Sequence, residues 1–355
     1  MQPKRNGKSY FVCRTLVVYL LSNDMRFYCH LFGRILKSLS FQRLWNLCVL
    51  YVSYCASRIW GNHVCKGMPA FISIEPTNIC NLQCPECPTG NKSSIVPKGK
   101  IQLKLCKTLI PQIKQSVLFA NLYFQGEPFV NESIIEIIKL AEDANIPTSI
   151  SSNAHFITPQ NADEIVKSGL TKLIISLDGY NQESYEKYRR NGSFQKVLDG
   201  MKAIQDAKKR QKSHFPLVEL QCLLFKHTET HIDEIRAIGK LYGADIVAFK
   251  TAQFYDAQNI DMLPSNKNSR YSVTNGTLNI KKELKNRCWK MWSSCIIAWN
   301  GNVLPCCFDK NHTFAFGSLD SKNLEQIWHS EAYNSFRKTV HTNRKQIKMC
   351  QNCSE

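Results

Sequence analysis

Short apolar runs alternate with helical patterns between residues 71 and 252, and this alternation constrains the fold more than any other feature of the sequence. The runs are FISIEP (71–76), VLFANLYFQ (117–125), PTSISSN (147–153), KLIISLDG (172–179), LVELQCLLF (217–225) and DIVAFKTA (245–252). Amphipathic helical segments lie between them, for example at 132–144 and 194–209. Such a succession predicts a parallel sheet with right-handed helical crossovers. Because there are six units rather than eight, we expect a partial TIM-like (β/α)6 barrel in the α/β class.

The length of the chain indicates that the barrel does not stand alone. A single core stops growing at roughly 250–300 residues, and this chain has 355. We predict a helical N-terminal extension (1–69), the barrel (70–275) and a small C-terminal α+β domain (276–355). The 43% of hydrophobic residues is typical of a globular protein.

The N-terminal extension contains two apolar runs, at 10–23 and 44–60. Arg or polar residues interrupt both runs, and both are shorter than the roughly 20 apolar residues that span a bilayer. We therefore predict neither a transmembrane helix nor an export signal. Two interpretations remain, of which we favour the first: amphipathic helices that pack on the barrel, or a basic and aromatic anchor at the inner face of a membrane. The expected location is cytoplasmic, with peripheral membrane contact under the second interpretation.

The chain is basic, with 46 Lys and Arg against 28 Asp and Glu, a formal net charge of +18. The basic residues are spread along the chain, with denser patches at 202–212 and 281–290. No recognisable nucleic-acid module accompanies these patches. We therefore interpret them as a solvated surface and expect no nucleic-acid partner.

Cysteines are unusually frequent, and nine of the sixteen lie in three short groups, which favours metal or redox chemistry. The other seven are scattered among apolar residues and are expected to pack as small hydrophobic side chains. The first group, Cys80, Cys84 and Cys87 in CNLQCPECP, directly follows the first predicted strand. This is the end of a parallel sheet where active sites form. A structural zinc site needs a fourth ligand, and no His lies between residues 82 and 100, whereas a cubane held at three corners leaves one iron open.

The C-x3-C-x2-C spacing after the first strand resembles the signature of the radical S-adenosylmethionine (SAM) superfamily. The resemblance implies a [4Fe-4S] cluster on Cys80, Cys84 and Cys87, with the open iron bound by the amino and carboxylate groups of SAM. In that family, one electron cleaves SAM to methionine and a 5'-deoxyadenosyl radical, which abstracts a substrate hydrogen. The family usually places an aromatic residue before the third cysteine, and here that residue is Glu86.

A second element of the same resemblance ends the second strand. Gly126, Glu127 and Pro128 match the GEP element that meets the methionyl amine of SAM. Glycine permits a close approach of the backbone, and a carboxylate suits an ammonium group.

Polar residues also follow the next two strands. Ser152 and Asn153 end the third strand and Ser176 and Asp178 end the fourth, and all four are suited to ribose hydroxyls. Arg189, in the following segment, is expected to pair with the carboxylate of SAM. Ordinary turn and capping chemistry is the alternative interpretation of these residues.

The remaining grouped cysteines form a second pattern. Cys288 precedes Gly301 by twelve intervening residues, four more separate Gly301 from Cys306, and Cys350 and Cys353 form a C-x2-C pair. This pattern resembles the SPASM and twitch extensions, which carry auxiliary [4Fe-4S] clusters in enzymes that modify peptides and proteins. The four thiolates would suffice for one fully ligated cluster.

We expect one auxiliary cluster, because only Cys295 and Cys307 remain for a second one. A structural zinc on the same four cysteines is the alternative. The resemblance implies an oxidoreductase that modifies a peptide or protein side chain and receives electrons from a reductant such as flavodoxin or ferredoxin. Because four cysteines would fill all corners of the auxiliary cluster, we expect this cluster to transfer electrons in an oxidation that consumes SAM as a co-substrate. Dehydrogenation or epimerisation of a carbohydrate or aminocyclitol remains open. A non-catalytic iron-sulfur or zinc protein on the same fold is the alternative from another class.

Overall fold

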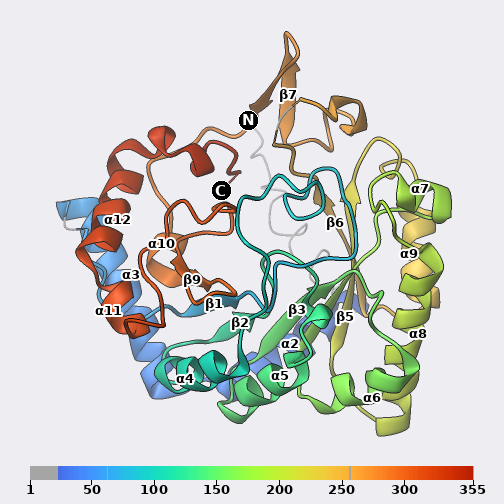
Figure 1. Cartoon of the computed structure of the whole chain (residues 1–355), viewed down its shortest axis with the longest axis horizontal. Coiled ribbons are helices and arrows are strands. Elements are labelled where there is room, and N and C mark those ends of the chain that lie inside the picture. The colour runs from blue at the N-terminus through green and yellow to red at the C-terminus, as the bar shows by residue number, and fades with distance from the viewer. Residues whose placement is uncertain (1–22, 62, 256, 355) are drawn as a thin grey trace, which may run out of the picture.

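The computed structural model describes residues 23–61, 63–255 and 257–354, so most of the apolar run at 10–23 lies outside the described residues. Its centre is an eight-stranded sheet in the order β10-β9-β1-β2-β3-β4-β5-β6 (Figure 1). The six predicted strands are all present, and neighbouring strands among them run parallel. Their bounds are Phe71–Ile74 (β1), Phe119–Asn121 (β2), Thr148–Ser152 (β3), Lys172–Ser176 (β4), Leu217–Leu224 (β5) and Ile246–Thr251 (β6). The partial (β/α)6 barrel is confirmed.

Helices connect these strands and form the outer arc in Figure 1. They are α4 (Leu103–Ile113), α5 (Ile134–Asp143), α6 (Pro159–Lys167), α7 (Gln182–Glu186), α8 (Phe194–Gln211) and α9 (Ile232–Leu241). In α8, Ser193 caps the first turn by accepting a hydrogen bond from the Lys196 amide. The apolar side chains of α8 that recur at helical spacing are buried against the sheet, as the sequence predicts: Val197, Leu198, Met201 and Ile204.

The C-terminal region extends the barrel sheet, which the sequence did not predict. Strand β9 (Ser294–Ile297) pairs in parallel with β1, with Phe71 opposite Ser294. Strand β10 (Val303–Leu304) then pairs antiparallel with β9 and forms the edge of the sheet. The first barrel strand and the C-terminal region therefore share backbone hydrogen bonds.

The rest of the C-terminal region contains one hairpin, short helices and long loops. Strands β7 (Tyr271–Thr274) and β8 (Thr277–Ile280) form a separate two-stranded sheet. The helices are α10 (Lys290–Ser293), α11 (Leu324–Trp328) and α12 (Glu331–Asn343).

The N-terminal helices α2 (Asn23–Ser38) and α3 (Phe41–Trp60) pack on the barrel. The buried guanidinium of Arg43 donates to the main-chain oxygens of Lys114 and Asn145, at 2.7 Å each. Arg34 forms an ion pair with Glu142. These partners precede β2 and β3, so α2 and the start of α3 lie at the amino ends of the strands. The favoured interpretation, packing on the barrel, agrees with this arrangement.

The second half of α3 lies beside the C-terminal helices (Figure 1). The ring of Tyr54 contacts the rings of Trp289 and Trp292, with centroids 5.3 and 5.4 Å apart. No helix in the described part of the chain has the length and hydropathy needed to cross a bilayer.

Candidate functional site

The loop after β1 carries Cys80, Cys84 and Cys87, which lie at the carboxyl end of that strand. The Cys87 amide donates to the Cys84 carbonyl at 3.2 Å, and the Leu82 amide donates to the Cys80 sulfur at 3.4 Å. A Cβ atom at Gly90 would lie 2.5 Å from the Cys84 amide nitrogen, so only glycine allows the loop to close on itself. The three thiols therefore belong to one compact loop.

Residues at the ends of three further strands, β2, β3 and β4, converge on these cysteines. A cavity of about 170 Å³ is lined by the three cysteines and by six further residues that the sequence singles out: Gly126, Glu127, Ser152, Asn153, Ser176 and Arg189. The carboxyl ends of parallel strands meet at one edge of a sheet, which explains why residues up to 109 positions apart share this cavity. Ser151 and Tyr188 also line it, and no sequence signal distinguishes them from ordinary core residues.

Glu127 links the ends of β2 and β3. Its carboxylate accepts hydrogen bonds from the Ser152 hydroxyl at 2.8 Å and from the Asn153 amide at 2.7 Å. Burial raises the pKa of Glu127 to about 7, against the lowering effect of these hydrogen bonds. A bound ammonium group would favour the ionised carboxylate, so the environment of Glu127 suits the methionyl amine of SAM.

Gly126 is required by its backbone conformation. Its φ is +70°, and a Cβ atom there would lie 2.4 Å from the Thr77 carbonyl oxygen. Any other residue would force the GEP turn away from the segment that leads into the cysteine loop.

Asp178 does not line the cavity, although the sequence suggested a contact with ribose. The side chain is fully buried, with one oxygen 2.5 Å from Arg189 Nε and the other accepting from the Leu223 amide at 2.6 Å. A buried carboxylate is most stable beside a guanidinium that satisfies it. This geometry favours a different role, in which Asp178 holds Arg189 beside the cavity.

Glu86 occupies the position where the family usually has an aromatic residue. It is 6% exposed, and its carboxylate accepts from the Tyr255 amide at 3.1 Å and from Asn259 Nδ2. The side chain therefore ties the cysteine loop to the segment after β6. It lines a second and larger cavity, not the one around the three cysteines.

The three-cysteine cavity has the donor set that a cubane with one open corner needs. Burial raises the pKa of Cys80 to about 12 and that of Cys84 to about 11. Thiolate ligands at these positions would therefore require a cationic centre to replace their protons. Polar groups on the other side of the cavity leave a place for an amino-acid ligand.

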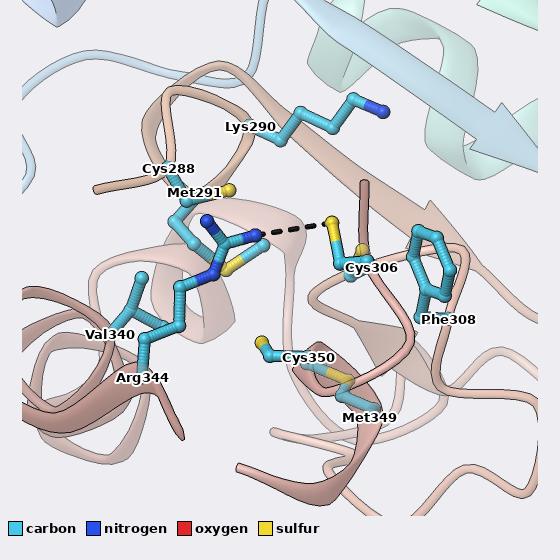
Figure 2. A pocket seen from close by; sticks show the side chains of 10 residues that line it. Cys288, Lys290, Met291, Cys306, Phe308, Val340, Arg344, Met349 and Cys350 are labelled. Carbon is cyan, nitrogen blue, oxygen red and sulfur yellow. Dashed lines mark hydrogen bonds between the residues drawn. The ribbon is translucent and has the colours of Figure 1, made fainter. Parts of the chain in front are cut away.

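The second cysteine pattern also converges. Cys288, Cys306, Cys350 and Cys353 line one cavity, into which Arg344 points (Figure 2). Apart from Lys290 and Arg344, the other side chains around it are apolar or thioether groups: Met291, Phe308, Val340 and Met349. Neither Cys295, which is 1% exposed in the core, nor the exposed Cys307 lines this cavity.

Arg344 directly contacts one of the four cysteines that line this second cavity. Its Nη2 donates to the Cys353 sulfur at 3.2 Å, and its Nη1 donates to the Arg287 carbonyl at 2.7 Å. Burial raises the pKa of the Cys288 and Cys350 thiols. Four thiols with this surrounding suit one fully ligated cluster. Within the described residues, no three His, Cys, Asp or Glu side chains lie close enough to bind a single metal ion.

Comparisons with known proteins identify the family. Residues 74–236 match the radical SAM superfamily model, and residues 288–354 match the SPASM model, an iron-sulfur cluster-binding domain. The chain therefore belongs to the radical SAM superfamily and carries a C-terminal SPASM domain. The radical SAM domain implies a [4Fe-4S] cluster and SAM, and the SPASM domain implies auxiliary iron-sulfur binding.

Curated relatives match parts of the chain. The AdoMet-dependent heme synthase of Methanosarcina barkeri is 28% identical over 140 residues, which is 39% of this chain and 40% of the relative. The mycofactocin maturase MftC of Mycolicibacterium smegmatis is 25% identical over 178 residues, 50% of this chain and 43% of the relative. The chain thus spans less than half the length of these relatives.

Solved structures share the fold over most of the chain. Streptococcus suis SuiB bound to S-adenosylmethionine aligns with a TM-score of 0.59 and 17% identity, covering 81% of this chain and 72% of SuiB. BtrN in complex with AdoMet and 2-DOIA aligns with a TM-score of 0.52 and 19% identity, covering 82% of this chain and 94% of BtrN. At these identities, the comparison supports the fold alone.

Proposed function

We propose that the protein is a radical SAM oxidoreductase that oxidises a peptide or protein side chain with the help of one auxiliary [4Fe-4S] cluster. The observation that carries this proposal is a cavity of about 820 Å³ between the two cysteine sites. Glu86 and Pro88, on either side of Cys87, line it at one end. Phe308 and Met349 line both this cavity and the four-cysteine cavity. A substrate held there would lie between the two proposed clusters.

The residues of the chain have distinct proposed roles at the first site. Cys80, Cys84 and Cys87 hold the cluster, and Glu127 receives the methionyl amine of SAM. Arg189, held by Asp178, receives the carboxylate of SAM, while Ser152, Asn153 and Ser176 face the ribose. When bound, the cluster and SAM supply a 5'-deoxyadenosyl radical for hydrogen abstraction.

The four-cysteine site is the proposed acceptor of the second electron that leaves the substrate in an oxidation. Removal of a hydrogen atom leaves a substrate radical, and a two-electron oxidation requires the loss of one more electron and a proton. Cys288, Cys306, Cys350 and Cys353 would bind all four corners of the auxiliary cluster, which would then have no open iron for a substrate. Electron transfer is therefore its proposed task, and SAM is consumed as a co-substrate.

The residues that line the large cavity favour a peptide as the substrate. Tyr271, Leu278 and Ile280 from the β7–β8 hairpin line it, and this hairpin pairs with no other strand of the described residues. A strand edge beside a cavity suits an extended chain, which can add main-chain hydrogen bonds. MftC is named as a maturase, and SuiB has also been solved bound to precursor peptide SuiA.

A small polar substrate is the second candidate. BtrN shares the fold over 94% of its own length and is described with AdoMet and 2-DOIA. The large cavity is within the size range of small-molecule sites, and polar groups such as Asp309 and Asn352 line it. Dehydrogenation or epimerisation of a carbohydrate or aminocyclitol would use the same two cysteine sites.

We also propose a cytoplasmic location, where reducing conditions keep free thiols available, and a reductant such as flavodoxin or ferredoxin. Cys80, Cys84, Cys288 and Cys350, for example, are free thiols. Peripheral membrane contact through the N-terminal helices is part of this proposal.

Anaerobic assay of the reconstituted full chain tests the proposed function. With dithionite and SAM, we expect 5'-deoxyadenosine, and with a peptide library we expect products lighter by two hydrogens in mass spectrometry. A reconstituted protein that binds both clusters but releases no 5'-deoxyadenosine would be a non-catalytic iron-sulfur protein. Products of unchanged mass would instead indicate isomerisation or epimerisation.

A further inference from the structure

Helix α3 has an apolar outer face in addition to its buried inner face. Phe41, Trp45, Val52 and Ile59 are 79%, 62%, 65% and 70% exposed. Their spacing of four, seven and seven residues places them on one side of the helix. Trp60, at the end of α3, is 76% exposed.

Helix α2 also has an exposed apolar side. Tyr28, Phe32 and Leu36 are 53%, 61% and 48% exposed and follow one another at intervals of four residues. The chain then passes into α3 over two residues, and the rings of Phe41 and Trp45 stack with centroids 6.4 Å apart. The exposed apolar residues of α2 and α3 together are called the outer helical face.

Packing of the helices on the barrel does not account for the outer helical face. The opposite side of α3 supplies that packing, because Leu50 is fully buried and Tyr54 is 9% exposed. Arg43 is also buried on this inner side and holds carbonyl oxygens at the amino ends of the strands. Large exposed apolar patches on soluble proteins mark interaction sites.

The charge of the segment that carries the outer helical face is mainly positive. Residues 23–74 contain six Lys or Arg, one Asp (Asp24) and no Glu. Four of these cations are exposed: Arg26, Lys37, Arg58 and Lys66. Glu142, a carboxylate that reaches α2 from the barrel, is engaged by Arg34. Two copies of the chain meeting through this face would bring like charges together, whereas an anionic surface would complement them.

We propose that the outer helical face docks the protein onto an anionic lipid membrane. Aromatic and aliphatic side chains on one side, with Lys and Arg around them, are typical of helices that lie in the membrane interface. The interfacial mode also agrees with the absence of a bilayer-crossing helix in the described ranges. Two apolar helices and several cations supply the two kinds of attraction that stable peripheral binding needs.

Docking through this face would orient the active site. Helix α2 and the start of α3 lie at the amino ends of β2 and β3, where Arg34 and Arg43 bind. The cysteine loop and the large cavity lie at the carboxyl ends of the strands. The cavity would therefore face water, and a water-exposed substrate, rather than a lipid, would reach it.

Vesicle flotation with the full-length protein tests this proposal without clusters or SAM. We expect the protein to float with phosphatidylcholine vesicles that contain phosphatidylglycerol, and to bind much less in high salt because surface attraction is screened. Phe41→Ser, Trp45→Ser and Ile59→Ser combined should reduce the bound fraction by about tenfold or more, because each removes apolar surface from the interface.

Leu241→Ser provides the matched control, since Leu241 is 78% exposed but lies on α9. This variant should bind vesicles like the parent. The proposal fails if the parent does not float, or if the triple variant floats as well as the parent, which would assign binding to other residues. It also fails if the parent is a dimer that the triple variant disrupts while neither binds lipid, because the face would then join two copies of the chain. None of these outcomes bears on SAM cleavage, so the docking and the catalytic proposals fail independently.

Discussion

The two cysteine cavities differ in what surrounds their thiols. Three cysteines line the first cavity together with polar groups, among them Glu127, Ser152 and Asn153. Four cysteines line the second, and most of its remaining wall is apolar. A polar wall stabilises an exchangeable charged ligand, whereas an apolar wall excludes one. This difference indicates that the first site suits an exchangeable cofactor, whereas the second suits a cluster bound by cysteine at all four corners.

The arginines of the two cavities differ in the same sense. Arg189 is held by the buried carboxylate of Asp178, and its Nη1 lies 3.9 Å from the Cys84 sulfur. Arg344 directs its Nη2 at the Cys353 sulfur at 3.2 Å. Both guanidinium groups therefore contact a cysteine sulfur of their own site, but the first is also held by a carboxylate beside a polar cavity, whereas the second also donates to the Arg287 carbonyl.

The largest expected effect comes from the first site. Replacing Cys80, Cys84 and Cys87 with Ala should abolish 5'-deoxyadenosine formation, because no other cysteine lines that cavity. Iron analysis should still find about four irons per chain, held by the second site. A variant with Cys29→Ala and Cys48→Ala, both exposed cysteines, should match the parent. If the triple variant still cleaved SAM, the first site would not be the site of SAM cleavage, and the proposed difference between the two sites would be wrong.

Loss of the second site should have a narrower effect. Replacing Cys350 and Cys353 with Ala should lower the iron content from about eight to about four per chain. SAM cleavage should persist while oxidised product falls sharply, because the substrate radical loses its electron acceptor. Cys307→Ala is the control, since Cys307 does not line the cavity. Full product formation without the second cluster would contradict the electron-transfer role, and one tightly bound zinc in the parent would make the site structural.

Breaking the ion pair between Asp178 and Arg189 tests whether this pair supports SAM binding at the first site. Asp178→Asn leaves the Arg189 guanidinium buried beside a neutral group, which should destabilise the fold by about 3 kcal/mol. The dissociation constant for SAM, measured by calorimetry on folded protein, should rise by roughly tenfold. Asp206→Asn, at an exposed ion pair with Lys202, should change neither quantity measurably. Unchanged SAM affinity in Asp178→Asn would argue that Asp178 acts on stability alone.

The smallest effect is expected at Arg344. Arg344→Gln removes a positive charge and a hydrogen bond to the Cys353 sulfur. Both would stabilise the reduced, more negative state of a cluster bound by the four cysteines. The reduction potential of the second cluster should therefore become more negative, by on the order of tens of millivolts, in an EPR-monitored titration. Lys345→Gln removes an exposed charge at the neighbouring position and should leave the potential near that of the parent. Equal potentials in parent and Arg344→Gln would show that Arg344 only packs against the site.

The barrel and the grouping of the thiols could be predicted from the sequence. The apolar runs and helical periodicity set the strands, since burial of each face depends on residue spacing alone. The same logic placed Gly126, Glu127, Asn153 and Ser176 near the cysteines, because the ends of parallel strands meet at one edge.

Features that depend on contacts between distant segments could be seen only in the folded chain. The pairing of β9 with β1 joins residues more than 200 positions apart, and nothing in either short run specifies that partner. The buried pair of Asp178 with Arg189 likewise replaced a ribose contact, because a carboxylate role depends on which donors the fold brings to it. The exposure of the outer helical face could not be predicted from the sequence for the same reason. An amphipathic pattern shows that a helix has an apolar side, but only packing shows that α3 has a second apolar side left exposed.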